Sequence, residues 1–186
     1  MISLRRACQV PLHSPPHYDV PGRCRYHLSA ANYEHAPIIG ASPERMSMFS
    51  AALCDLFSGE TADLYAWCVL PNHWHALVGT ETLSALIKSI GKLHGKTSFE
   101  WNGQDGQRGR RCWFCCADRR IRSEAHFYAV RNYIHHNPVK HGYVDRWEER
   151  SFSSAAGFLE MTGRDEVLRQ WREFPVLNMG EKWDID

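Results

Sequence analysis

The chain has 186 residues, of which 44% are hydrophobic and 12% aromatic, which suits one domain with its own core and excludes an intrinsically disordered chain. The formal net charge is +1, so total charge favours no class of partner. No run of about 18 apolar residues exists, which excludes a transmembrane helix, and the N-terminus lacks the apolar stretch of a signal peptide. With seven cysteines in no framework spacing, we expect reduced thiols in a cytoplasmic protein without a membrane partner.

The first expected elements are a strand and a helix. "RCRYHLSAAN" (Arg23–Asn32) is interpreted as the strand. The helix is predicted to begin after Ser42, because a serine side chain can cap a helix and Pro43 suits its first position. Apolar residues then recur at helical spacing as far as Leu56.

A pair of strands is predicted next. "DLYAWCVL" (63–70) is rich in aromatic and β-favouring residues and predicts one strand. Pro71 and Asn72 suit the central positions of a tight turn. "HWHALVG" (73–79) is therefore expected to return as the antiparallel partner.

The middle of the chain combines a helical pattern with a loop and a cysteine-rich stretch. Apolar residues at helical spacing predict a helix from Thr82 to Phe99. The Gly- and Gln-rich stretch 100–110 is interpreted as a mobile loop. "CWFCC" (112–116) contains a CxxC, the half-site spacing of structural zinc, but no second such pair complements it. We therefore expect a strand at 112–116 in place of a zinc site.

Ser123 is expected to cap a further helix. This helix should end near Asn137, because the residue before Pro138 disfavours helical backbone. "GYV" (142–144) would begin a short extended piece, and a peripheral helix and tail would follow. The order strand, helix, strand–turn–strand, helix, strand, helix predicts an α+β fold, a ferredoxin-like antiparallel sheet with helices on one face.

Charge is distributed unevenly along this single domain. Residues 108–122 hold six arginines against one acidic residue, whereas ten acidic and six basic residues follow from Asp145 to the end. This asymmetry predicts an anion-binding face that the net charge conceals. We expect one domain over 1–186, with a core of about 20–145 and a peripheral segment of about 146–186. The acidic segment is hypothesised to occlude or regulate the anion-binding site.

"VLPNHWHALV" (69–78) places two histidines one residue apart. Residues i and i+2 of a strand point to the same face, so His73 and His75 could hold one divalent ion between them. The alternative, an ordinary exposed or hydrogen-bonded pair, is common for this pattern. The histidines alone do not decide between the two.

The helix expected after Ser123 carries a second group of candidates. Tyr133 and Asn137 are four residues apart and therefore share a helix face. Asn137 offers a carbonyl oxygen, which suits Mg²⁺ or Mn²⁺, and Tyr133 offers a phenol, a potential nucleophile. The alternative is that Tyr133 is a core aromatic, because apolar residues lie beside it on the helical wheel.

The two motifs together resemble a known family. "YAWCVLPNHWHALV" followed by "NYIHHNPVKHGYV" is similar to the REP-associated tyrosine transposases, within the single-tyrosine HUH (His-hydrophobic-His) superfamily of IS200-like transposases. "RYHLSA", "LSALIKSIGKLHGKTSF", "GRRCWFCCADRRIRSEAHFYAVRNY" and "SFSSAAGFLE" resemble further segments of the family, so the resemblance extends over most of the chain.

The resemblance implies a metal-dependent DNA-nicking and strand-transfer enzyme with its catalytic tyrosine on a helix. His73 and His75 would bind Mg²⁺ or Mn²⁺, with Asn137 as third ligand. Tyr133 would attack single-stranded DNA and form a 5′-phosphotyrosine. The better-known insertion-sequence members carry glutamine where this chain has Asn137, which makes its role as a ligand the least secure of the three.

Activation of the phenol and oligomeric state stay open. A phenol with a pKa near 10 is mostly protonated at neutral pH, so Tyr133 needs a base or a nearby metal. His135, His136 and His141 lie nearby in the sequence, and nothing in it chooses among them. The resemblance permits either a monomer or a homodimer.

The implied partner is single-stranded or hairpin DNA formed by REP-like palindromic repeats, which would place the protein in the cytoplasm at the nucleoid. Trp113 and Phe114 could stack on unpaired bases or pack in the core. The alternatives for the whole chain are a non-catalytic single-stranded nucleic-acid binding module of ferredoxin-like fold and a metal-dependent hydrolase that uses water. Phosphate contacts are expected from Arg110, Arg111, Arg119, Arg120, Arg122 and Lys140.

Overall fold

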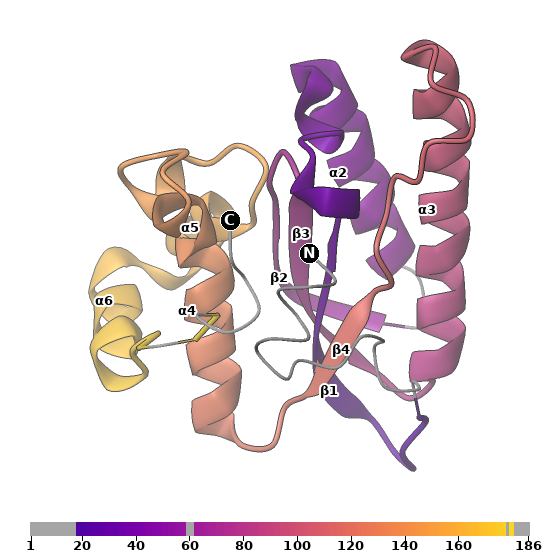
Figure 1. Cartoon of the computed structure of the whole chain (residues 1–186). Helices are drawn as coiled ribbons and strands as arrows, with labels where there is room; N and C mark the ends of the chain where they lie inside the picture. The colour runs from indigo at the N-terminus through magenta and orange to yellow at the C-terminus, as the bar shows by residue number, and fades with distance from the viewer. Residues whose placement is uncertain (1–17, 59–61, 178, 181–186) are drawn as a thin grey trace, which may run out of the picture.

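The computed structural model describes residues 18–58, 62–177 and 179–180. A four-stranded antiparallel sheet in the order β2-β3-β1-β4 forms its centre (Figure 1). The first six long elements follow the order β-α-β-β-α-β, so the ferredoxin-like α+β fold is confirmed. The strands and long helices are β1 (Cys24–Ala31), α2 (Pro43–Phe57), β2 (Ala62–Val69), β3 (His73–Thr80), α3 (Leu83–Gln104), β4 (Ala117–Arg120) and α4 (Glu124–Lys140). Short 3₁₀ turns (Tyr33–His35, Ile39–Ala41, Trp147–Glu149) and the helices α5 (Ala155–Thr162) and α6 (Arg164–Glu173) complete the described chain.

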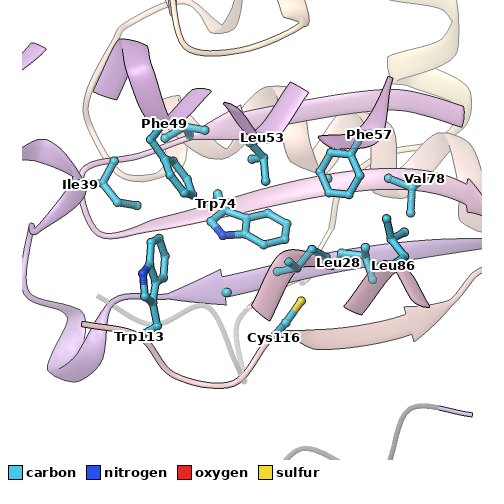
Figure 2. Packing of buried hydrophobic residues seen from close by; sticks show 14 of the residues in the cluster. Leu28, Ile39, Phe49, Leu53, Phe57, Trp74, Val78, Leu86, Trp113 and Cys116 are labelled. Carbon is cyan, nitrogen blue, oxygen red and sulfur yellow. The ribbon is translucent and has the colours of Figure 1, made fainter. Parts of the chain in front are cut away.

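One face of the sheet packs against α2 and α3, which lie together on the same side of it in Figure 1. Alternate residues of β3, among them Trp74 and Val78, enter this core with Leu28 of β1. Figure 2 shows Trp74 surrounded by Phe49, Leu28 and other apolar side chains. Burial of one tryptophan removes on the order of 200 Å² from water, which stabilises the fold by about 5 kcal/mol.

The opposite face of the sheet is covered by α4, which the expected fold did not place there. Leu77 of β3 and Ala66 of β2 pack with Phe127, Val130 and Ile134 of α4 in a second apolar cluster. The helix α6 packs against α4 on its far side from the sheet (Figure 1), whereas α5 begins beside β2, where Ser154 hydrogen-bonds the backbone of Trp67. Helices therefore cover both faces of the sheet. His73 and Leu77, which flank His75 on the same face of β3, contact residues of α4.

Two capping predictions are confirmed by hydrogen bonds. The Ser42 side chain accepts a hydrogen bond from the Arg45 backbone N–H at the start of α2. The Ser123 side chain accepts one from the His126 N–H at the start of α4. Each bond satisfies one of the N–H groups that a helix leaves unpaired in its first turn.

The middle of the chain differs from the expected loop and strand. The helix α3 continues to Gln104, because Trp101 and Asn102 are buried side chains of its last turn. Residues 112–116 contribute only an isolated bridge between Trp113 and Asn32, and the strand β4 begins later, at Ala117. Trp113 packs in the core, which was one of the two alternatives considered for it, the other being stacking on unpaired bases.

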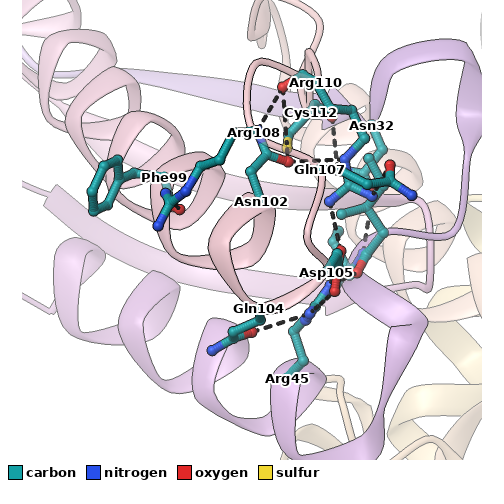
Figure 3. Close-up of polar contacts among 12 residues, drawn as sticks. Asn32, Arg45, Phe99, Asn102, Gln104, Asp105, Gln107, Arg108, Arg110 and Cys112 are labelled. Carbon is teal, nitrogen blue, oxygen red and sulfur yellow. Dashed lines mark hydrogen bonds and ion pairs between the residues drawn. The ribbon is translucent and has the colours of Figure 1, made fainter.

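The expected mobile loop is held by a polar network around Asp105 (Figure 3). Arg45 of α2 donates two hydrogen bonds to the Asp105 carboxylate, at 2.7 and 3.1 Å, and Arg110 donates another at 2.6 Å. The Arg45 hydrogen bonds hold the pKa of Asp105 at about 2. Asn102 accepts from the Arg110 side chain and donates to its carbonyl oxygen, so this segment is ordered by contacts within itself and by Arg45 from α2.

The helix α4 does not stop before Pro138 but ends one turn later, with Lys140. The Tyr143 N–H donates to the Pro138 carbonyl and the Gly142 N–H to the Val139 carbonyl. Gly142 has a φ of 69°, and this pair of bonds is the Schellman arrangement that closes a helix with a left-handed glycine. The expected extended piece at 142–144 is therefore a helix cap. Proline is tolerated here because it costs only one of the helix's hydrogen bonds, near its end.

The buried His94 predicts a pH-dependent stability. Its ring stacks on Trp113 with centroids 4.0 Å apart and its Nε2 accepts from Trp74 Nε1 at 3.2 Å, while burial lowers its pKa to about 3. Because the folded pKa is depressed, this group's contribution is present above the unfolded pKa near 6.5 and is lost progressively below it, by roughly 1.4 kcal/mol per pH unit. We expect urea unfolding to show a lower free energy of unfolding at pH 5 than at pH 7.5. His94→Gln, which keeps an acceptor without a titrating ring, is expected to reduce this difference but not remove it, because burial also lowers the pKa of His135. An unchanged pH dependence in the variant would contradict the assignment.

Candidate active site

Strand alternation places His73 and His75 on the sheet face that α4 covers. The tight turn at Pro71–Asn72 precedes β3, as the sequence predicts, and Leu77 of the same alternation lies in the apolar cluster beneath α4. The centroids of the two imidazole rings are 5.0 Å apart. Both side chains are buried, so they belong to the interior between sheet and helix.

The helix α4 brings Tyr133 and Asn137 to these histidines. Asn137 Oδ1 lies 3.1 Å from His73 Nε2, across 64 residues of sequence, and Asn137 Nδ2 donates to the Tyr133 hydroxyl at 3.2 Å. The Tyr133 ring lies edge-on to His75, with centroids 5.5 Å apart. The four residues from the two motifs therefore form one cluster, and Tyr133 is both a packed aromatic and a neighbour of the histidines.

The donor set fits a hard or borderline divalent cation. Two imidazoles and an amide oxygen are ligands that Mn²⁺ accepts and that Mg²⁺ accepts less readily at nitrogen. Two neighbouring ligands of an octahedral ion at about 2.1 Å are separated by about 3.0 Å, close to the distance between His73 Nε2 and Asn137 Oδ1. Among the described residues no group of three or more His, Cys, Asp or Glu side chains is arranged to hold a metal, so the set depends on Asn137.

Each histidine has its second ring nitrogen engaged by a neighbour. His73 Nδ1 lies 2.7 Å from Asn72 Oδ1, and His75 Nδ1 lies 3.1 Å from Nε2 of His27 on β1. His27 belongs to neither sequence motif and was not predicted as a site residue. The available signal was its alternation with Tyr26 and Leu28, which are core residues on the other face of β1.

The histidines considered as bases on α4 differ in position. His135 points away from the cluster, where its Nε2 lies 2.9 Å from Ser154 Oγ, and burial lowers its pKa to about 3. Burial also lowers the pKa of the half-buried His136, whose ring contacts Trp171 of α6. His141 lies beside His73, with ring centroids 4.9 Å apart. Among the described contacts of these three histidines, only those of His141 include a residue of the cluster, namely His73.

A C-terminal segment lies over the Tyr133 hydroxyl. A Cβ built on Gly180 would lie 2.7 Å from the hydroxyl oxygen and 3.0 Å from Lys140 Nζ, so only glycine fits this approach. Val176 and Met179 pack against the apolar cluster around Tyr133. The Tyr133 side chain is 0% exposed, and the chain after α6 contributes to that burial.

The basic residues expected to contact DNA are dispersed. Arg119 and Arg120 are exposed on β4, where Arg119 pairs with His27 of β1. The guanidinium of exposed Arg111 lies 4.7 Å from the Tyr33 ring centroid and 5.7 Å from that of half-buried Phe114.

The other three residues expected to contact DNA, Arg110, Arg122 and Lys140, are dispersed as well. Arg110 is tied to Asp105 in the network of Figure 3. Arg122 is exposed just before α4. The Lys140 ammonium lies 5.7 Å from the Tyr133 ring centroid, which brings Lys140 to the cluster.

The cysteines in the part of the chain that the structure describes form no metal-binding group. Cys112 is buried and its thiol lies 3.2 Å from Asn102 Oδ1, while Cys115 is exposed. The described cysteines are free thiols. In the described part of the chain, no helix has the length and apolar character needed to span a membrane.

Comparison with known proteins supports the fold. No protein-family model and no curated protein matches the sequence. The structure is similar to that of a REP-associated tyrosine transposase bound to a REP hairpin, with a TM-score of 0.62 and 19% identity, over 80% of this chain and 86% of that one. It is also similar to a protein of Deinococcus radiodurans R1 provisionally described as a transposase, with a TM-score of 0.43 and 17% identity, over 64% of this chain and 95% of that one. The second score is too low to establish a common fold, whereas the first shows the fold that the sequence resemblance implied.

Proposed function

We propose that this chain is a REP-associated tyrosine transposase of the single-tyrosine HUH superfamily, which nicks and transfers single-stranded or hairpin DNA through a 5′-phosphotyrosine intermediate. The proposal rests chiefly on one observation: the Tyr133 hydroxyl, the Asn137 amide and His73 form a continuous chain of contacts at 3.2 and 3.1 Å. Two motifs that are distant in sequence meet as this chemistry requires. The shared fold with a hairpin-bound transposase is consistent with it.

The proposed reaction is a transesterification at phosphorus. The Tyr133 oxygen forms a bond to the phosphorus, and the bond from phosphorus to the 3′ oxygen breaks. The phenol proton passes to a base, and the 3′ oxygen leaves as a hydroxyl after taking up a proton. Because one phosphodiester replaces another, rejoining the strand needs no ATP.

The protein side chains orient the reacting groups. Asn137 holds the Tyr133 hydroxyl through Nδ2 while its Oδ1 faces His73, so nucleophile and candidate metal ligands are positioned by one amide. When bound, a divalent ion held by His73, His75 and Asn137 would neutralise charge on the scissile phosphate. Lys140, beside the Tyr133 ring, supplies a further positive charge near the phosphate.

The exposed arginines of β4 supply contacts to the DNA backbone in this proposal. Arg119 pairs with His27 of β1 and shares its face of the sheet, whereas Arg120 pairs with Tyr26 and lies on the opposite face. Arginine contacts to phosphates position a nucleic acid without reading its sequence. The hairpin would therefore be held beside the cluster that contains Tyr133.

The proposal is tested by mapping a covalent adduct. Full-length protein is incubated with a labelled REP-type hairpin carrying a single-stranded flank and Mn²⁺, then digested with trypsin and analysed by mass spectrometry. We expect a nucleotide phosphate on the peptide that contains Tyr133. DNA binding without any adduct would favour the non-catalytic binding module, and cleavage without an adduct would favour a hydrolase that uses water.

The segment over Tyr133 predicts that shortening the chain raises activity. The hydroxyl cannot reach a phosphate while Gly180 lies against it, so Gly180 must move before the attack. In an initial-rate assay on the same hairpin, a chain ending at Phe174 is expected to form the adduct faster than the full chain. The ratio of the two rates measures how strongly the contact of Gly180 with Tyr133 slows adduct formation. A chain ending at Gly180 keeps the contact and serves as the matched control. Equal rates for all three chains would show that the segment does not limit access.

A further inference from the structure

We infer that His27 of β1 is a positioning residue that holds His75 in the ring orientation and tautomer needed to bind the metal, an inference that rests on the proposed function. His27 is 4% exposed, and its Nε2 lies 3.1 Å from His75 Nδ1. The two rings are tilted, with centroids 5.1 Å apart. His27 thereby contacts the metal-binding motif from a different strand.

The direction of this hydrogen bond follows from the chemistry of the site. A neutral imidazole carries one N–H and one lone pair, so a His75 that binds a metal through Nε2 must carry its proton on Nδ1. That Nδ1–H then donates to His27 Nε2, which accepts. If His27 donated instead, the His75 proton would be on Nε2 and the metal could not bind there. A second residue that engages the far nitrogen is the usual companion of a metal-binding histidine.

The same arrangement recurs at the other histidine. His73 Nδ1 is engaged by Asn72 Oδ1 at 2.7 Å, and its Nε2 faces Asn137 Oδ1. Both candidate ligands therefore have Nδ1 held by a neighbouring side chain. His27 lies on β1 and Asn72 lies in the turn before β3. The rings of His73 and His75 are therefore oriented by residues outside the motif His73-Trp74-His75.

Packing alone does not explain why a polar imidazole ring occupies the position of His27. The sheet face beneath α4 is mainly apolar, with Ala66, Leu77 and Phe127 among its members, and burial of a polar ring there costs free energy unless it is hydrogen-bonded. His27 also lies edge-on to Tyr133, with ring centroids 5.9 Å apart. It therefore contacts both His75 and Tyr133, which also contact each other.

The test measures metal affinity, not only activity. Binding of Mn²⁺ to the full chain without DNA is followed by the electron paramagnetic resonance signal of free Mn²⁺, for wild type, His27→Leu and His27→Gln. Loss of such a companion typically weakens metal binding about 10–100-fold, which is the effect expected for His27→Leu. Glutamine can place an acceptor oxygen near the position of Nε2, so we expect His27→Gln to restore most of the affinity.

Controls separate the role of His27 from folding and from the metal site itself. His94→Gln changes a buried histidine on the opposite face of the sheet and is expected to bind Mn²⁺ like wild type. Should His27→Leu fail to fold by circular dichroism, His27→Asn replaces it, because asparagine is too short to reach His75. Wild-type affinity in the Leu or Asn variant would overturn the inference and leave the metal site standing. A wild-type chain that binds no Mn²⁺ would overturn both.

Discussion

Replacement of Tyr133 by phenylalanine is expected to abolish the covalent protein–DNA adduct while the protein stays folded and still binds the hairpin. The substitution removes only the hydroxyl, and the ring keeps its place in the apolar cluster with Val130 and Ile134. Asn137 Nδ2 loses an acceptor, which costs about 1 kcal/mol of stability. Without the attacking oxygen, adduct formation should fall by more than about 10³-fold.

A denaturing gel of the labelled hairpin after incubation with Mn²⁺ measures this loss directly. Tyr128→Phe is the matched control, because Tyr128 lies on the same helix but stacks on Phe174, with ring centroids 4.8 Å apart. We expect the control to form the adduct at the wild-type rate. An adduct that persists in the Tyr133→Phe protein would show that another residue is the nucleophile.

Loss of the metal or of His73 is expected to have the second-largest effect. A chelator should stop cleavage of the hairpin, and added Mn²⁺ should restore it. His73→Ala removes one imidazole and the partner of Asn137 Oδ1, so cleavage at a fixed Mn²⁺ concentration should fall about 10²–10³-fold, the usual cost of losing one group that stabilises developing charge. The readout is the initial rate of nicking, with the Mn²⁺ affinity measured in parallel.

Two further variants divide the roles at this site. His136→Gln changes a histidine of α4 that contacts Trp171 of α6 and should leave cleavage unchanged. Asn137→Asp keeps an oxygen toward His73 but no longer donates to Tyr133, so we expect it to retain Mn²⁺ binding while adduct formation slows. Cleavage that continues undiminished in the presence of chelator would remove the case for a metal at His73 and His75.

Local sequence patterns predicted most elements correctly, because each depends on neighbouring residues. The cap at Ser42, the turn at Pro71–Asn72 and the strand that follows it are short-range features, and the structure has all three. The cap at Ser123 belongs to the same class. Strand alternation also sufficed to assign His73 and His75 to one face.

Errors arose where contacts made by other residues override the preference of the residues in the element itself. Residues 100–104 are rich in polar residues, yet they are helical because Trp101 is packed in the core and Arg45 binds Asp105. Pro138 was expected to stop α4, but the Schellman cap around Gly142 closes the helix after it. In the first case the deciding partner, Arg45, lies 60 positions away from Asp105. In the second case the helix is closed by Gly142, which lies beyond the proline that was expected to stop it.

The sequence by itself determined which residue types could carry the chemistry: two histidines at strand spacing, and a tyrosine and an asparagine at helical spacing. Only the tertiary structure decided that they meet, because a fold that lays α4 across β3 brings Asn137 to His73, which lies 64 positions earlier in the sequence. It also decided what surrounds them, namely His27 from β1 and Gly180 from the C-terminal segment. Those neighbours belong to no motif, since a side chain's surroundings depend on how the sheet and helices pack and not on the order of residues along one element.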